Sequence, residues 1–151
     1  MFGFFFYLGA CLVAAFVLTT LWVLTRPLHA KDDVRSWRML FILYVLCCLG
    51  PYGYVEVMTR VVGTKLKAAV EDSFAGVGIR GDLQYYKVVS YNGRKARVIA
   101  VGEERQEWGG TDRPVVAFTM VRKGEDWESD SYNVVYSDRL SRDGTTLPPY
   151  W

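Results

Sequence analysis

Clustered carboxylates are the feature of this sequence closest to a catalytic or metal-binding pattern. They form two groups in the second half of the chain: Glu103, Glu104 and Glu107, then Glu125, Asp126, Glu128 and Asp130. Neighbouring carboxylates can share the roles of general acid and general base, and they bind calcium when their spacing follows an EF-hand loop. Neither group has that spacing, and Arg105, Arg122 and Lys123 lie among them. We therefore interpret both groups as a solvated rim.

Nucleophilic catalysis lacks its usual partners in this sequence. The only histidine is His29, which is far along the chain from the serines of the second half. A serine nucleophile needs an adjacent base, and a metal site needs several converging ligands. We predict that the chain is not an enzyme and holds no metal or resident cofactor.

The cysteines are confined to the apolar part of the chain. Cys11, Cys47 and Cys48 all lie in long uncharged runs, and the charged remainder contains none. This distribution gives no disulfide framework. We interpret the three as small packing residues in helices, with lipidation or a redox role as the alternative.

Charge is distributed unevenly along the chain. The net charge is +2, yet residues 56–151 hold fourteen basic and fourteen acidic side chains. The excess therefore lies in residues 26–38, which carry Arg26, Lys31, Arg35 and Arg38 against two aspartates. Nucleic-acid binding needs a basic face, so the balanced half argues against a nucleic-acid partner.

Two uncharged runs predict a membrane hairpin over residues 1–56. Residues 1–25 contain no charged side chain, and neither do residues 39–55. About 20 apolar residues cross a bilayer as a helix, so we expect spans at about 3–25 and 39–56. The first run has no basic residue ahead of it and is too long for a typical signal peptide.

The basic loop 26–38 predicts the orientation of this hairpin. Short loops rich in Lys and Arg stay in the cytoplasm, which places both termini and the later residues in the periplasm if the membrane is a bacterial inner membrane. Arg60, Lys65 and Lys67 follow the second span closely and weaken this signal. Trp22 and Trp37 flank the loop, as aromatic residues do at the headgroup level.

Two local features shape the anchor. Gly50-Pro51 interrupts the second run, and proline kinks a helix because it lacks a backbone donor. The chain also starts with an aromatic cluster that includes Phe4, Phe5 and Tyr7. We expect that cluster to contact lipid, another membrane subunit, or a flat pigment or quinone.

Residues 57–137 predict a small α+β domain. Apolar residues recur at three- and four-residue spacing over 57–74, which indicates an amphipathic helix. Strands are expected at 83–90, 95–101, 115–122 and 127–137, and Asn92-Gly93 is a strong hairpin signal between the first two. One helix would then cover one face of a four-stranded antiparallel sheet.

This order of elements is similar to that of cystatin-like folds. It also resembles the small domains of membrane-anchored assembly factors in the respiratory chain. The resemblance covers residues 57–137 and rests on element order, without a motif of specific residues, and a fold by itself does not give a function.

Aromatic residues supply the predicted contact surface. Residues 138–151 read as an irregular tail that ends on Tyr150 and Trp151, and Tyr85 and Tyr86 enrich the first strand. Tyr and Trp are favoured contact residues at interfaces. We therefore predict a non-catalytic accessory, structural or assembly subunit of a larger membrane complex, of respiratory or photosynthetic type. The alternative is a membrane-anchored ligand-binding or sensing module with a pocket between helix and sheet.

Overall fold

The computed structural model describes residues 2–25, 36–79, 81–105, 109–138, 140 and 142–144. His29, most of the basic loop, and the tail residues Tyr150 and Trp151 lie outside the described residues. The chain divides into two units, one ending at Gly53 and the other beginning at Tyr54. Each unit is described by itself.

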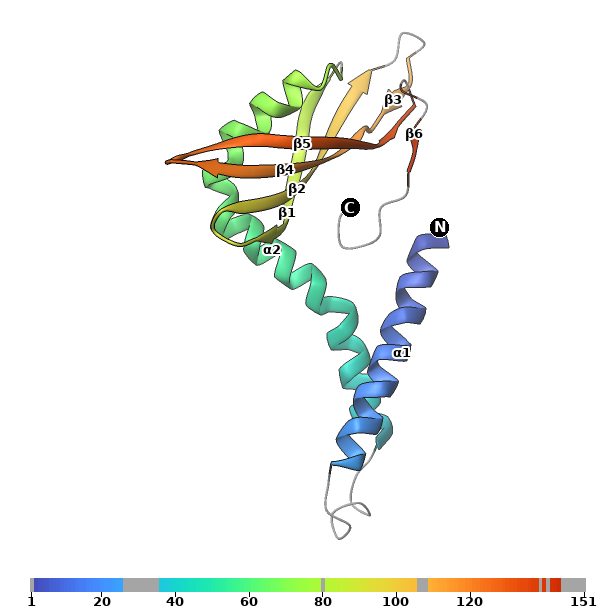
Figure 1. Ribbon diagram of the computed structural model, residues 1–151. Coiled ribbons are helices and arrows are strands. Elements are labelled where there is room, and N and C mark those ends of the chain that lie inside the picture. The colour runs from blue at the N-terminus through green and yellow to red at the C-terminus, as the bar shows by residue number, and fades with distance from the viewer. Residues whose placement is uncertain are drawn as a thin grey trace. The chain divides into compact units, whose positions relative to one another are not determined.

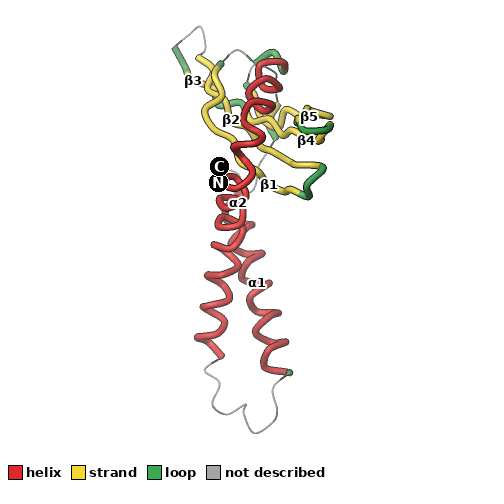
Figure 2. Tube along the Cα trace, turned by 90° about the vertical axis from the view of Figure 1, so that its left-hand side faces the viewer, coloured by secondary structure: helices red, strands yellow, loops and turns green. Residues whose placement is uncertain are grey.

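The first unit is a helical hairpin. Helix α1 spans Phe2–Leu24, and helix α2 spans Ser36–Gly76 and begins in this unit. Figure 2 shows α1 running alongside the first half of α2. Both helices are long and apolar enough to cross a membrane by length and composition, as the two uncharged runs predicted.

The two helices meet along a narrow seam of small residues. Cys11, Ala15 and Thr19 recur every four residues on α1 and are buried, with Ala15 fully covered. Residues four apart share one face of a helix, so this seam faces α2. Ala10 and Ala14, which are also small residues of α1, lie outside this seam and are exposed.

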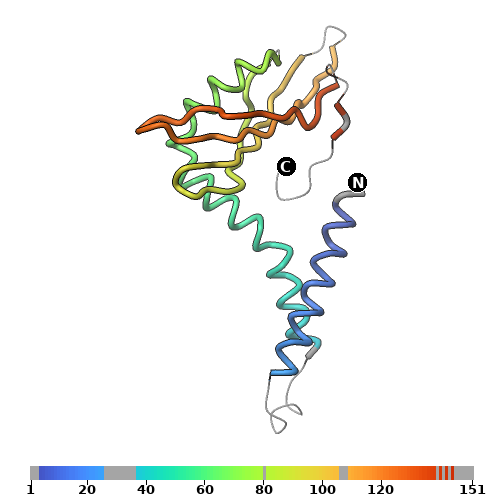
Figure 3. Tube along the Cα trace, viewed as in Figure 1, coloured from blue at the N-terminus to red at the C-terminus, as the bar shows by residue number. Residues whose placement is uncertain are grey.

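Helix α2 continues without a break through Pro51. The predicted second span and the predicted amphipathic helix are therefore parts of one helix of 41 residues. The missing backbone donor of Pro51 does not end the helix, since the residues on both sides have strong helical patterns. In Figure 3 the chain is coloured by residue number, so that α2 can be traced from its start to its end as one continuous helix.

The second unit contains an antiparallel sheet. Its four long strands are β1 (Asp82–Tyr91), β2 (Lys95–Arg105), β4 (Val115–Lys123) and β5 (Asp126–Ser137). They follow one another in the order β1-β2-β4-β5, which confirms the predicted meander. In Figure 1 the pair β4 and β5 runs across the direction of β1 and β2, so the sheet is strongly twisted.

Two short strands add to the predicted sheet. Strand β3 (Thr111–Asp112) pairs with the end of β2, and β6 (Arg142–Asp143) pairs with the end of β5. The first lies in a stretch that the sequence predicted as a connection, and the second lies in the predicted irregular tail. Both are two residues long, too short to show a period of alternating side chains.

The turn between β1 and β2 has the predicted Asn-Gly chemistry. The Asn92 side-chain oxygen accepts hydrogen bonds from the backbone N–H groups of Arg94 and Lys95 at 3.2 and 2.7 Å. Gly93 has a φ of 80°, a value that glycine adopts without steric cost. The turn is therefore fixed by its own residues.

The core of the domain lies between α2 and one face of the sheet. Leu66 and Val70 of α2 are fully buried, and they face Val98, Val116 and Phe118 of the central strands. Burial of such side chains contributes about 1.5–3 kcal/mol each. This arrangement confirms an α+β domain in which a helix covers an antiparallel sheet.

Candidate functional site

The acidic groups split between surface and interior. Glu104 and Asp112 lie opposite each other in the β2–β3 pair and are nearly fully buried, with 5% and 3% of their surface exposed. Asp112 accepts a hydrogen bond from the backbone N–H of Asp138 at 3.1 Å through one oxygen, and its other oxygen has no partner. Glu104 therefore departs from the predicted solvated rim, to which Asp112 was not assigned.

The remaining acidic group near the β4–β5 turn is solvent-facing, as expected for a rim. Lys123 Nζ lies 2.6 Å from a carboxylate oxygen of Glu128. The pKa of Lys123 is raised because it donates a hydrogen bond to Glu128 and is attracted by that charge. Among the described residues, no group of three His, Cys, Asp or Glu side chains is arranged to hold a metal ion.

The hairpin interior holds a cluster of hydroxyl and thiol groups. Tyr7 donates a hydrogen bond to the backbone oxygen of Cys48 at 2.9 Å, and its ring packs edge-on against Tyr52 at 6.4 Å. The Cys11 thiol donates a hydrogen bond to the backbone oxygen of Cys47 at 3.5 Å. Tyr7 was predicted as a partner contact, but its hydroxyl is used between the two helices.

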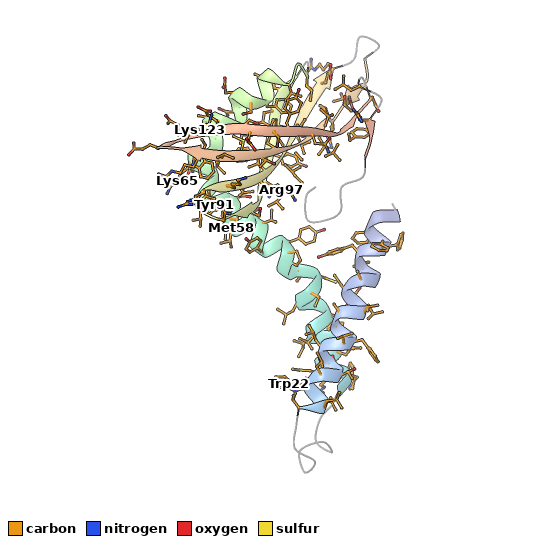
Figure 4. All side chains as sticks on the ribbon, in the orientation of Figure 1. Trp22, Met58, Lys65, Tyr91, Arg97 and Lys123 are labelled. Atoms are coloured by element: carbon orange, nitrogen blue, oxygen red, sulfur yellow. The ribbon has the colours of Figure 1, made fainter. Side chains whose placement is uncertain are left out.

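The outer surface of the hairpin is apolar on nearly every side. Phe4 and Phe5 are exposed, Phe5 by 69%, and so are many aliphatic and aromatic side chains of both helices. These include Phe6, Phe16, Leu21, Trp37, Phe41, Leu46 and Leu49. Figure 4 shows side chains projecting outward from both helices of this unit, with Trp22 labelled near the end of α1.

An apolar depression lies between the two helices near their connection. It has a volume of about 360 Å³ and is lined by Phe16, Thr19, Trp37 and Leu40, among others. Its lining is almost entirely apolar, so it suits an acyl chain or a flat ring.

The face of the sheet away from α2 carries a groove. Its apolar floor includes Ile99 and Ala117, and its sides include Arg97, Tyr132 and Asn133. The groove measures about 350 Å³, near the lower end of the range for small-ligand sites. Tyr132 lies opposite Phe118 in the β4–β5 pair and its ring contacts that core residue, so the ring, which is 56% exposed, lies on the face of the sheet that carries the core.

The groove adjoins an open sheet edge. Strand β5 pairs with β4 along its length, but on its other side the described residues pair with it only at Val135, Tyr136 and Ser137, through Gly144 and β6. The backbone groups of an open edge strand can pair with another chain. Tyr132 and Asn133 therefore belong both to the groove and to a strand edge available for contact.

The two predicted tyrosines of β1 have different roles. Tyr86 packs against the core, and its hydroxyl donates to the backbone oxygen of Gly63 at 3.0 Å. Tyr85 is partly exposed and lies opposite Val101 of β2. Strand alternation could have separated them, since neighbouring residues on a strand point to opposite faces.

Sequence reasoning missed the groove residues. Arg97, Tyr132 and Asn133 come from strands that are distant along the chain, and only the β2–β4–β5 pairing brings them together. Comparison of the chain with protein-family models, curated proteins and solved structures found no match.

Proposed function

We propose that this chain is a membrane-anchored, non-catalytic accessory subunit of a larger membrane protein complex, with α1 and the first half of α2 crossing the bilayer. The observation that carries the proposal is the exposed apolar surface of the hairpin. Such a surface marks a membrane or protein contact, and helices in a membrane pack through small residues like those of the α1 seam.

The groove and open edge of the sheet support contact with a protein neighbour. The exposed side chains of Tyr132 at the edge strand and Arg97 in the groove are of residue types that are enriched at interface centres. The unpaired part of β5 offers backbone groups for strand addition. We propose that this face docks on another subunit, of respiratory or photosynthetic type as the sequence predicted.

The alternative is a ligand-binding or sensing module. The sequence predicted a pocket between helix and sheet for this function. That interface is instead filled by core side chains, each with at most 1% of its surface exposed: Leu66, Val70, Phe118 and Met120. A ligand would instead use the groove on the other face. The likeness to cystatin-like folds remains a prediction from element order.

We propose an orientation with the basic loop 26–38 in the cytoplasm and the domain in the periplasm of a bacterial inner membrane. The loop's excess of basic residues supports it.

Site-specific photo-crosslinking in native membranes tests the proposed role. Benzoylphenylalanine at Tyr132 samples the open β5 edge beside the groove, and at Phe5 it samples the anchor. The same group at Glu71, on the exposed side of α2, is the matched control. We expect discrete adducts with another protein from Tyr132 and Phe5, and none from Glu71.

The proposal fails if neither position yields an adduct and the protein purified in mild detergent is a lone monomer. A small-molecule adduct at Tyr132, with no protein adduct, would favour the ligand-binding alternative.

A further inference from the structure

We propose that the β1–β2 turn is a binding site for anionic phospholipid headgroups. The inference rests on the proposed insertion of the hairpin in a bilayer, and it adds a lipid class and a site on the domain.

Strand β1 is fixed to α2 by three side-chain contacts. Tyr86 donates to the oxygen of Gly63, the N–H of Val88 donates to the hydroxyl of Thr59 at 2.9 Å, and Lys87 Nζ lies 2.6 Å from a Glu56 oxygen. These contacts hold β1 in place along the part of α2 that directly follows the uncharged run.

The same contacts set the direction of the strand. From Tyr86 to Val88 the strand advances two residues, about 7 Å, while its partners step back from Gly63 to Thr59, four helix residues or about 6 Å. Strand and helix therefore run in opposite directions. Tyr91, three residues beyond Val88, therefore lies alongside the end of the uncharged run of α2, just before Glu56.

A groove confirms this placement. It is lined by Tyr54 of α2 together with Tyr91, Asn92, Lys95, Arg97 and Thr119, and it measures about 380 Å³. Tyr54 is 49% exposed and comes just before Glu56, the first charged residue after the run. In Figure 4, Met58, Tyr91 and Arg97 lie at one end of the domain.

Charge at this end is one-sided. Residues 83–102 contain Lys87, Arg94, Lys95 and Arg97 and no Asp or Glu, although the domain as a whole is balanced. Lys87 is held by Glu56. Within the described part of the chain, Arg94, Lys95 and Arg97 are exposed and form no ion pair.

Neighbouring acids do not neutralise these three cations. Glu56 bonds to both Arg60 and Lys87, and Glu128, two strands away from Lys95 in the same register, bonds to Lys123. Three free cations with two tyrosines suit phosphate groups at a membrane surface, because basic residues attract anionic lipids and tyrosine favours the headgroup level.

Hydrogen exchange of the full-length protein in nanodiscs tests the site. Discs of phosphatidylcholine alone are compared with discs of phosphatidylcholine and phosphatidylglycerol. We expect the amides of residues 89–97 to exchange several-fold more slowly in the anionic discs. This slowing should disappear in a triple variant, R94Q/K95Q/R97Q. It should also disappear at about 1 M salt, where the Debye length is only about 3 Å.

A second triple variant, K67Q/R105Q/R113Q, is the matched control. It removes the same charge from exposed positions outside the turn and should keep the slow exchange. Unchanged exchange of core amides such as those of Val98 and Phe118 shows that both variants are folded.

Equal exchange of the turn in both disc types overturns the proposal. So does protection that appears only in native membranes, which would assign the turn to an acidic protein partner. Failure of the chain to enter discs of either composition would instead overturn the proposed membrane anchor, and the two failures are thus distinguishable.

Discussion

The phenol of Tyr86 donates a hydrogen bond to the backbone oxygen of Gly63 across the contact between β1 and α2, at 3.0 Å. The Tyr86 ring lies close to the backbone here, since a Cβ added at Gly63 would be in van der Waals contact with the hydroxyl at 3.4 Å. Burial raises the pKa of Tyr86, and the negative charge of Glu71 adds to the effect. One residue thus connects sheet and helix and responds to pH.

Replacement of Tyr86 by Phe removes the hydrogen bond, at a cost of about 0.5–1.5 kcal/mol. A raised pKa means that the folded state holds its proton more tightly than the unfolded state. The stabilisation is therefore complete below the ordinary tyrosine pKa of 10.0 and is lost as pH rises through the folded-state value.

Urea unfolding of the full chain in detergent at neutral and alkaline pH measures both effects. The Y86F variant should lose less stability than the wild type between these two conditions. Y85F is the control because Tyr85 lies on the other face of β1, and it should match the wild type. A Y86F variant with unchanged stability and unchanged pH dependence would contradict the assigned contact.

Gly102 of β2 faces the ring of Phe74, and a Cβ at this position would overlap that ring. We expect G102A to destabilise the domain by about 1–3 kcal/mol, the usual cost of overpacking a core. Truncation of the ring in the double variant G102A/F74L should restore part of the loss. G76A has open space around its Cβ, so it should leave the urea midpoint unchanged or raise it.

The Cys11 thiol on α1 donates a hydrogen bond to the backbone oxygen of Cys47 on α2, and Cys48 is the next residue along that helix. A membrane-permeant oxidant should convert Cys11 and Cys48 to a disulfide with loss of two protons and two electrons to the oxidant. The count of labelled thiols in denatured protein would then fall from three to one, with a mass decrease of about 2 Da.

C47A is the control for that cross-link, because it should leave the Cys11–Cys48 disulfide intact. C48A should abolish it. Retention of all free thiols in the oxidised wild type would show that the two helices pack in another register.

The proposed orientation is tested with single cysteines in a cysteine-free background. E71C should react with a membrane-impermeant maleimide in intact spheroplasts, and K31C should react only after lysis. The reverse labelling would place the domain in the cytoplasm, as the basic residues Arg60, Lys65 and Lys67 would favour.

The sequence patterns predicted the long elements well because each has a strong local signal. The Asn92-Gly93 pair marked the first hairpin, and the spacing of Val62, Leu66, Val70 and Phe74 marked the buried side of α2. Pro51 was predicted to kink the second span, and α2 continues through this residue as one helix.

The candidate sites were harder to predict because they depend on pairing between distant strands. Nothing in the local sequence separates Glu104, buried opposite Asp112, from the exposed Glu103 beside it. The basic character of the β1–β2 turn was not predicted, because the domain as a whole carries equal numbers of basic and acidic side chains. The position of this turn follows from the hydrogen bonds that join Tyr86 and Val88 to α2.

In the sequence, the second half of α2 comes before all the strands that pack against it. During synthesis, Leu66 and Val70 therefore leave the ribosome before their partners Val116 and Phe118 exist. An amphipathic helix in this state can lie in the bilayer interface, and the proposed anchor would already hold it there. The membrane would then shield the apolar face of α2 until the sheet forms, which makes insertion of the anchor a step in the folding of the domain.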